Sequence, residues 1–174
     1  MRRLFITADE LGITSQRTHS IFQLTEHGTV TGTSIIPNFP HSDIAARHAK
    51  ERDLSAGLHI NLTDGFPLSE ERDISSLLQT DGVFLGMEGL ERGIAESEID
   101  RTHIERELRS QFEWMLDTYG QPTHVSGYHH IHVHPFVSKI LVPLLDQGLS
   151  KIDQRGQLHG IPRSPSVPGD AGRT

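Results

Sequence analysis

The sequence has no cysteine among its 174 residues. This excludes disulfides, iron–sulfur clusters, thiolate zinc sites and cysteine nucleophiles. It also has no apolar run approaching the ~20 residues that cross a bilayer, so we expect no membrane-spanning segment. The basic start at Met1–Thr7 reaches an acid at Asp9 and leaves no room for a secretory signal core, which predicts a cytoplasmic protein.

Positive charge is also in short supply. Sixteen Lys and Arg residues stand against twenty-three Asp and Glu residues, which gives a net charge of −7. An acidic chain has no electrostatic reason to bind nucleic acid or an acidic membrane surface. We therefore expect neither as a partner.

The length predicts one compact domain, over residues 1–162, followed by a tail. Residues 163–174 are rich in Pro, Gly and Ser, a composition typical of disorder. Within the domain, predicted strands alternate with predicted helices. The strands are expected at residues 3–8, 30–36, 57–62 and 123–135, with a further one near 158–161, and the helices at 15–27, 43–52, 102–119 and 137–146.

This alternation predicts an α/β fold, a (β/α) barrel-like arrangement with a parallel sheet. A closed barrel of this kind usually needs ~200 residues or more, and only four strands are clear. We therefore expect an incomplete barrel. Such sheets place reactive groups at the carboxyl ends of their strands.

Histidine is the residue type in excess. The chain has twelve, and five fall between His124 and His134. If this stretch is extended, its even-numbered side chains share one face, because side chains alternate along a strand. Several imidazoles on one face are costly to bury without partners, and a divalent metal ion is one such partner. A row of surface or hydrogen-bonded histidines is the alternative.

Other predicted strands bring further candidate groups. Asp9 and Glu10 follow the first strand, and His59 lies in the third. Adjacent acids on a strand point in different directions, so one can bind a metal while the other takes a proton from a metal-bound water. The alternatives are an acid pair that favours the start of the next helix and a hydrogen-bonded core histidine.

Three motifs then resemble a known family, the YdjC-like carbohydrate deacetylases. They are Ile6-Thr7-Ala8-Asp9-Glu10-Leu11-Gly12, Gly57-Leu58-His59-Ile60-Asn61-Leu62-Thr63, and the histidine-rich stretch from Pro122 to Pro135. The resemblance runs from about Arg3 to Pro162. It implies a barrel-like fold, a divalent cofactor, Mg²⁺ or Zn²⁺, and hydrolysis of N-acetyl groups on amino-sugar oligosaccharides.

Carried over position by position, the resemblance makes Asp9 the general base and His59 a metal ligand. Glu10 stands where the family has a metal-binding aspartate. The chain departs from the family at Tyr128, where a second histidine ligand is expected, and at Ser126, where the family has an aspartate. A neutral phenol is a poor ligand for magnesium or zinc, so His130, two residues along, is the expected replacement ligand.

Two functions from different classes remain open. One is a metal-dependent deacetylase that acts on acetylated oligosaccharides. The other is a shortened, catalytically impaired relative that serves as a binding or structural protein. A phosphoesterase is disfavoured, because the chain has no Gly-rich phosphate cradle. An incomplete barrel leaves sheet edges uncovered, so we also expect a homo-oligomer.

Overall fold

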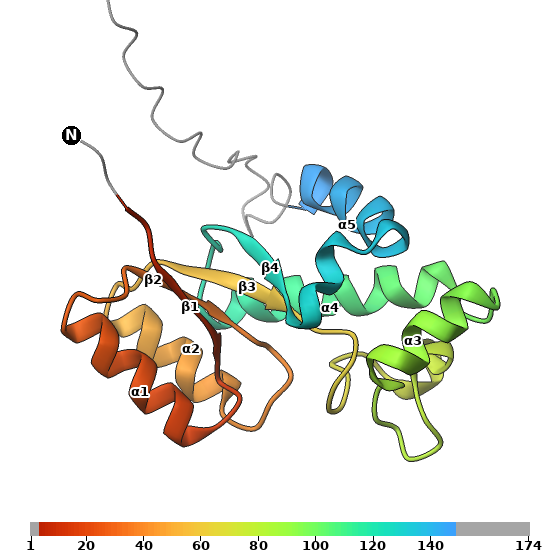
Figure 1. Ribbon diagram of the computed structural model, residues 1–174, viewed down its shortest axis with the longest axis horizontal. Helices are drawn as coiled ribbons and strands as arrows, with labels where there is room; N and C mark the ends of the chain where they lie inside the picture. The colour runs from red at the N-terminus through yellow and green to blue at the C-terminus, as the bar shows by residue number, and fades with distance from the viewer. Residues whose placement is uncertain (1–3, 149–174) are drawn as a thin grey trace, which may run out of the picture.

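The computed structural model describes residues 4–148, which form a parallel sheet with helices packed against it (Figure 1). The strands stand in chain order, each parallel to its neighbours: β1 (Thr7–Leu11), β2 (Gly32–Ile35), β3 (Ala56–Ile60) and β4 (Val125–Gly127). The helices are α1 (Ser15–Glu26), α2 (Ser42–Glu51), α3 (Gly86–Ala95), α4 (Arg101–Thr118) and α5 (Pro135–Gly148). Three 3₁₀ segments lie between them: η1 (Glu71–Asp73), η2 (Ser75–Leu77) and η3 (Tyr128–Val133). The predicted α/β class is confirmed.

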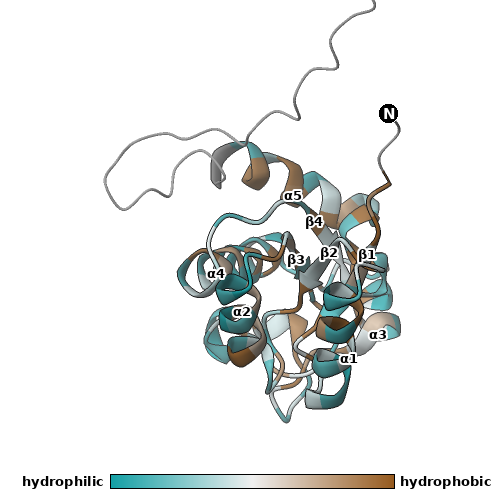
Figure 2. Ribbon diagram, turned by 90° about the vertical axis from the view of Figure 1, so that its left-hand side faces the viewer, coloured by the Kyte–Doolittle hydropathy of each residue, from teal (hydrophilic) through white to brown (hydrophobic). Residues whose placement is uncertain are grey.

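The two faces of the sheet differ in chemistry. One face carries apolar residues that pack against α1, α2 and α4, with Ile35, Leu58 and Ile60 fully buried. Figure 2 shows α1 and α2 on one side of the sheet and α5 on the other. Because side chains alternate along each strand, the opposite face carries a second, polar set: Thr7, Asp9, Ser34, His59 and Ser126.

Side-chain caps begin two of the helices. Thr14 accepts a hydrogen bond from the backbone N–H of Arg17 at the start of α1. Asp100 does the same for Thr102 at the start of α4. These caps set where α1 leaves β1 and where the long helix α4 begins its run beside β3.

The predicted strand 123–135 is wrong over most of its length. Strand β4 ends at Gly127, and η3 follows at once. His129 and His130 take left-handed backbone angles, with φ of 50° and 56°. Two such residues reverse the chain direction locally, so the alternation that would have placed the even-numbered histidines on one face stops after Ser126.

Smaller corrections concern element ends. Strand β1 begins at Thr7 and contains Asp9 and Glu10, which the sequence placed after the strand. Helix α5 continues through Pro143, a residue type that usually kinks or breaks a helix. The strand predicted near 158–161 and the tail at 163–174 lie outside the described residues. Within residues 4–148, no helix is both long and apolar enough to span a membrane.

Candidate functional site

A chain of polar side chains crosses the sheet from β1 to β4, one residue from each strand. The Ser34 hydroxyl donates to Asp9 Oδ1 at 2.6 Å and lies 3.2 Å from His59 Nδ1. The Ser126 hydroxyl lies 2.8 Å from the same nitrogen. We call these four residues the acid–imidazole chain. It confirms that carboxylate and imidazole groups from distant segments meet on one face of the sheet.

The hydrogen-bond pattern favours one tautomer of His59. The Ser34 hydroxyl proton goes to Asp9, so a proton on His59 Nδ1 would satisfy the contacts with both Ser34 and Ser126. In that tautomer the lone pair of the neutral ring is on Nε2. Burial lowers the pKa of His59 from 6.5 to about 4; the Asp9 carboxylate opposes this, and His132, His130 and His124 add to it. His59 is therefore a neutral imidazole near pH 7.

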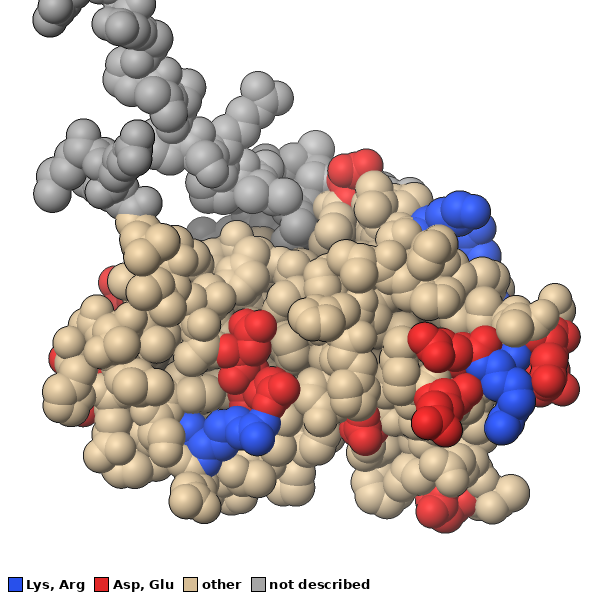
Figure 3. All heavy atoms as spheres, in the orientation of Figure 1, with Lys and Arg blue, Asp and Glu red and all other residues tan. Residues whose placement is uncertain are grey.

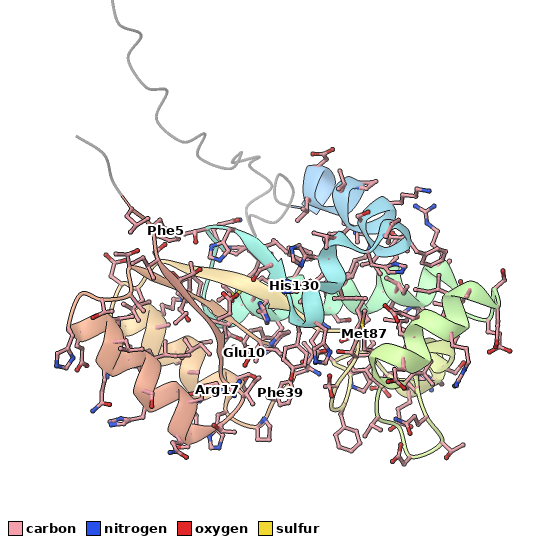
Figure 4. The ribbon with its side chains drawn as sticks, viewed as in Figure 1. Phe5, Glu10, Arg17, Phe39, Met87 and His130 are labelled. Carbon is pink, nitrogen blue, oxygen red and sulfur yellow. The ribbon has the colours of Figure 1, made fainter. Side chains whose placement is uncertain are left out.

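Glu10 is held by a different contact. Its carboxylate forms an ion pair with Arg17 Nη1, from the first turn of α1. Glu10 has a left-handed backbone, with φ of 69°, at an irregularity in the pairing of β1 with β2. Figure 4 labels both residues at the carboxyl end of β1, and Figure 3 shows acidic and basic groups adjoining on this face.

The five clustered histidines occupy several environments. His124 lies against the β3 backbone, where a Cβ at Gly57 would be 2.5 Å from the imidazole. Burial lowers the pKa of His124, against an opposing effect of Asp9. His134 Nδ1 accepts from the N–H of Phe136 at the start of α5 and so has a structural role.

The middle of the cluster is closest to His59. The rings of His130 and His132 are 6.3 Å apart between centroids. Burial, and next the neighbouring His130, lower the pKa of His132. The His132 Nδ1 atom is buried and has no hydrogen-bond partner among the described residues.

The loop after β3, residues 61–69, is fixed by α4. The Gln111 side chain accepts from Asn61 N at 2.9 Å and donates to Asn61 O at 2.5 Å, as a neighbouring strand would. Gln111 also donates to Glu107, which accepts from the N–H groups of Leu68 and Ser69. Asn61, Glu107 and Gln111 are all fully buried. The loop thus has a defined conformation beside the acid–imidazole chain.

A cavity of about 480 Å³ lies on the polar face of the sheet. Asp9 and Ser126 line it, together with residues nearer the amino ends of the strands: Phe5, Thr7, Ser55, Thr123 and His124. Phe5 contributes an aromatic ring edge-on to His124, with 6.4 Å between centroids. The acid–imidazole chain is therefore accessible from this side.

The donors predicted for a metal ion are not assembled in this conformation. Within residues 4–148, no group of three or more His, Asp or Glu side chains is placed to share one ion. Glu10 forms an ion pair with Arg17, and His130 is exposed in the turn after β4. The neutral Nε2 of His59 is a suitable donor, but the predicted set of Glu10, His59 and His130 stays a prediction.

Sequence reasoning missed Ser34 and the role of Ser126. Ser34 is the polar residue in a strand that is otherwise apolar or β-branched, which was the available signal. Where the family has an aspartate, this chain has Ser126, and its neutral hydroxyl contacts His59 Nδ1.

Comparisons with known proteins identify a family and several relatives of this chain. The family model described as YdjC-like protein matches residues 3–161. A carbohydrate deacetylase of Mus musculus is 34% identical over 82% of this chain and 47% of its own length. One from Geobacillus stearothermophilus is 33% identical over 84% of this chain and 57% of its own. The chain thus spans about half the length of the curated relatives it matches.

A solved structure shows a similar fold. It is a crystal structure from Enterococcus faecalis of a protein proposed to cleave cellobiose phosphate, with a TM-score of 0.73 and 23% identity. The match covers 82% of this chain and 55% of the other. The parallel sheet and its surrounding helices are therefore an arrangement that solved proteins also adopt.

Proposed function

The chain belongs to the YdjC-like family, and we propose that it is a carbohydrate deacetylase that removes N-acetyl groups from acetylated amino-sugar oligosaccharides. The observation that carries the proposal is the acid–imidazole chain. It holds an exposed carboxylate and a buried neutral imidazole on the same face of the sheet.

Asp9 is the proposed general base. Its Oδ1 is oriented by Ser34, and the residue is exposed on the polar face of the sheet. Asp9 would take a proton from a water molecule as that water adds to the amide carbonyl carbon. Breakage of the C–N bond then releases acetate. His132, or His130 where it does not bind the cation, would pass the proton taken up by Asp9 to the nitrogen, which leaves the sugar with a free amine.

A divalent cation, Mg²⁺ or Zn²⁺, is part of the proposal, with Glu10, His59 and His130 as its expected ligands. Its chemistry would be to polarise the amide carbonyl. Since Glu10 contacts Arg17, that ion pair would have to open before Glu10 could bind the cation.

Acetate release from N,N′-diacetylchitobiose tests the proposal. We expect release with added Mg²⁺ or Zn²⁺, suppression by EDTA, and loss of at least ~100-fold in Asp9→Asn, in keeping with the effect of removing a general base. Asp117→Asn, an exposed acid on α4, is the matched control and should retain activity. No release from any acetylated sugar with either metal would contradict the proposal.

A second candidate is an impaired relative with a binding role. It is favoured because Glu10 is held in an ion pair and because no set of metal-binding side chains is assembled within residues 4–148. Calorimetric titration with Zn²⁺ and Mg²⁺ separates the two. Tight one-to-one binding that is lost in His59→Ala supports the enzyme. Millimolar binding that is insensitive to this change supports the impaired relative.

We also propose that the protein self-associates. Strand β1 is at one edge of the sheet, and the segment leading into it exposes Leu4, Phe5 and Ile6 by 78%, 57% and 42%. An open edge with apolar flanking residues favours pairing with a second chain. A monomer in light scattering at all concentrations would refute this.

A further inference from the structure

Beside the acid–imidazole chain lies a group of residues that the proposed reaction does not use: Phe39, Asp64, Tyr128 and His129. We call this group the aromatic shelf. We propose that the shelf is a sugar-binding subsite, in which the rings contact the apolar face of a pyranose while Asp64 and His129 bind its hydroxyl groups. The inference rests on the proposed function, since it identifies where that substrate binds.

The ring geometry connects the shelf to His59. The Tyr128 ring is edge-on to His59, with 6.1 Å between centroids, and 4.2 Å from the ring of His129. Phe39 is edge-on to Tyr128 at 6.4 Å. The C–H groups on one face of a pyranose carry slight positive charge and are attracted to the negative face of an aromatic ring. A sugar held here would lie against the Tyr128 ring, which itself contacts His59.

The polar part of the shelf comes from the loop after β3 and the turn after β4. His129 Nδ1 is 3.4 Å from Asp64 Oδ2 and 3.1 Å from Thr63 Oγ1. The side chains of His129 and Asp64 are 43% and 44% exposed, so each has surface left for a ligand. The Asp64 carboxylate accepts hydrogen bonds, and His129 Nδ1 is already engaged by this loop, so Nε2 is the ring nitrogen left for a hydroxyl group, which can both donate and accept.

The shelf is built before a ligand arrives. The Asn61 Oδ1 atom accepts from the N–H groups of Thr63 and Asp64, and its amide donates to Asn38 and to Asp64 O. Asn38 in turn donates to the carbonyls of Asp64 and Phe66. Groups that are already ordered lose little conformational entropy on binding, so weak polar contacts contribute more of their energy to affinity.

The turn after β4 directs His129 toward this loop. A regular strand would continue past Gly127, but the left-handed conformations of His129 and His130 bend the chain back. Such conformations cost of order 1 kcal/mol each and persist where the surroundings hold them, commonly at ligand sites. In Figure 4, Phe39 and His130 are labelled between α1 and α3, beside the ends of the strands.

A purely structural role is the competing explanation, in which His129 and Asp64 only join two loops. Binding of N,N′-diacetylchitobiose in EDTA distinguishes the two, because it measures the shelf without turnover. We would use calorimetry and saturation-transfer NMR on the full chain. Asp64→Asn and His129→Ala should each weaken binding by about tenfold, the effect of losing one or two hydrogen bonds. A purely structural role would lower the melting temperature and leave the affinity of the folded protein unchanged.

Further variants test the rings. Tyr128→Phe should bind as wild type, because the ring and not the hydroxyl makes the contact, whereas Tyr128→Ser should lose at least about tenfold. His19→Ala and Asp117→Asn, exposed residues on α1 and α4, are the matched controls and should not change the affinity.

The outcomes separate the subsite from the reaction. Binding that weakens in the shelf variants, with no acetate release under any condition, supports the subsite and contradicts the deacetylase. Acetate release with an unchanged KM in Asp64→Asn and His129→Ala contradicts the subsite and leaves the deacetylase standing. Wild-type protein that binds no disaccharide, with or without metal, overturns the subsite.

Discussion

Replacement of Gln111 by leucine should weaken the protein and loosen the loop after β3. Gln111 is fully buried on α4 and satisfies both the N–H and the carbonyl of Asn61, itself fully buried. Leucine has a similar volume, so little packing is lost, but both backbone groups of Asn61 and the buried Glu107 carboxylate each lose a partner. Each buried unsatisfied group costs about 1–3 kcal/mol, so we expect a loss of at least about 3 kcal/mol and a fall in Tm of at least about 10 °C.

Two measurements check this reasoning. Urea denaturation gives the free energy of unfolding, and hydrogen exchange shows whether the amides of residues 61–69 lose protection beyond the global change. Gln16→Leu, at an exposed position of α1, is the control and should change stability by less than about 0.5 kcal/mol. A Gln111→Leu protein as stable as wild type, with residues 61–69 still protected, would refute the role assigned to Gln111.

Three further changes test the site. In EDTA, lowering the pH from 7.5 to 5 should remove about 2 kcal/mol of stability through His59. The pKa of His59 is about 4 in the folded protein and near 6.5 in the unfolded chain, so the stabilisation is complete above pH 6.5 and is lost toward pH 4. His59→Gln should lack this pH-dependent loss of stability in urea titrations, and a pH dependence identical to that of the wild type would contradict the assignment. Gly57→Ala should lower the free energy of unfolding by about 1–3 kcal/mol in thermal melts and shift the His124 ring signals in NMR spectra, since the new Cβ would overlap the imidazole. Unchanged ring signals would count against the packing of His124 on Gly57. Arg17→Ala should tighten Zn²⁺ or Mg²⁺ binding by up to about fivefold in calorimetry, because the change releases Glu10 from its ion pair. An unchanged affinity for both metals would show that Glu10 is not a ligand.

The sheet was largely predictable because its signals are local. The β-branched run around Thr33 and Ile35 predicts β2, and the motif around His59 predicts β3. The family resemblance is confirmed by the match over residues 3–161. Asp9 and His59 do share a face, since the acid–imidazole chain joins them.

The histidine-rich stretch was not predictable in the same way. Left-handed residues are usually signalled by glycine or asparagine, and here they are His129 and His130. The side chain of His129 contacts Thr63 and Asp64, more than sixty residues away in the chain. The pairing of Glu10 with Arg17 likewise depends on how α1 leaves β1, which residue spacing alone does not determine.

The sequential order of the four strands has a consequence for synthesis on the ribosome. Each strand pairs with the one made before it, so the sheet can grow in the direction of translation without waiting for a distant partner. Asp9, Ser34 and His59 come from the first three strands, whereas Ser126 follows only after the chain has passed through α4. A nascent chain released before β4 would therefore carry the carboxylate and the imidazole but lack the second hydroxyl that holds the ring.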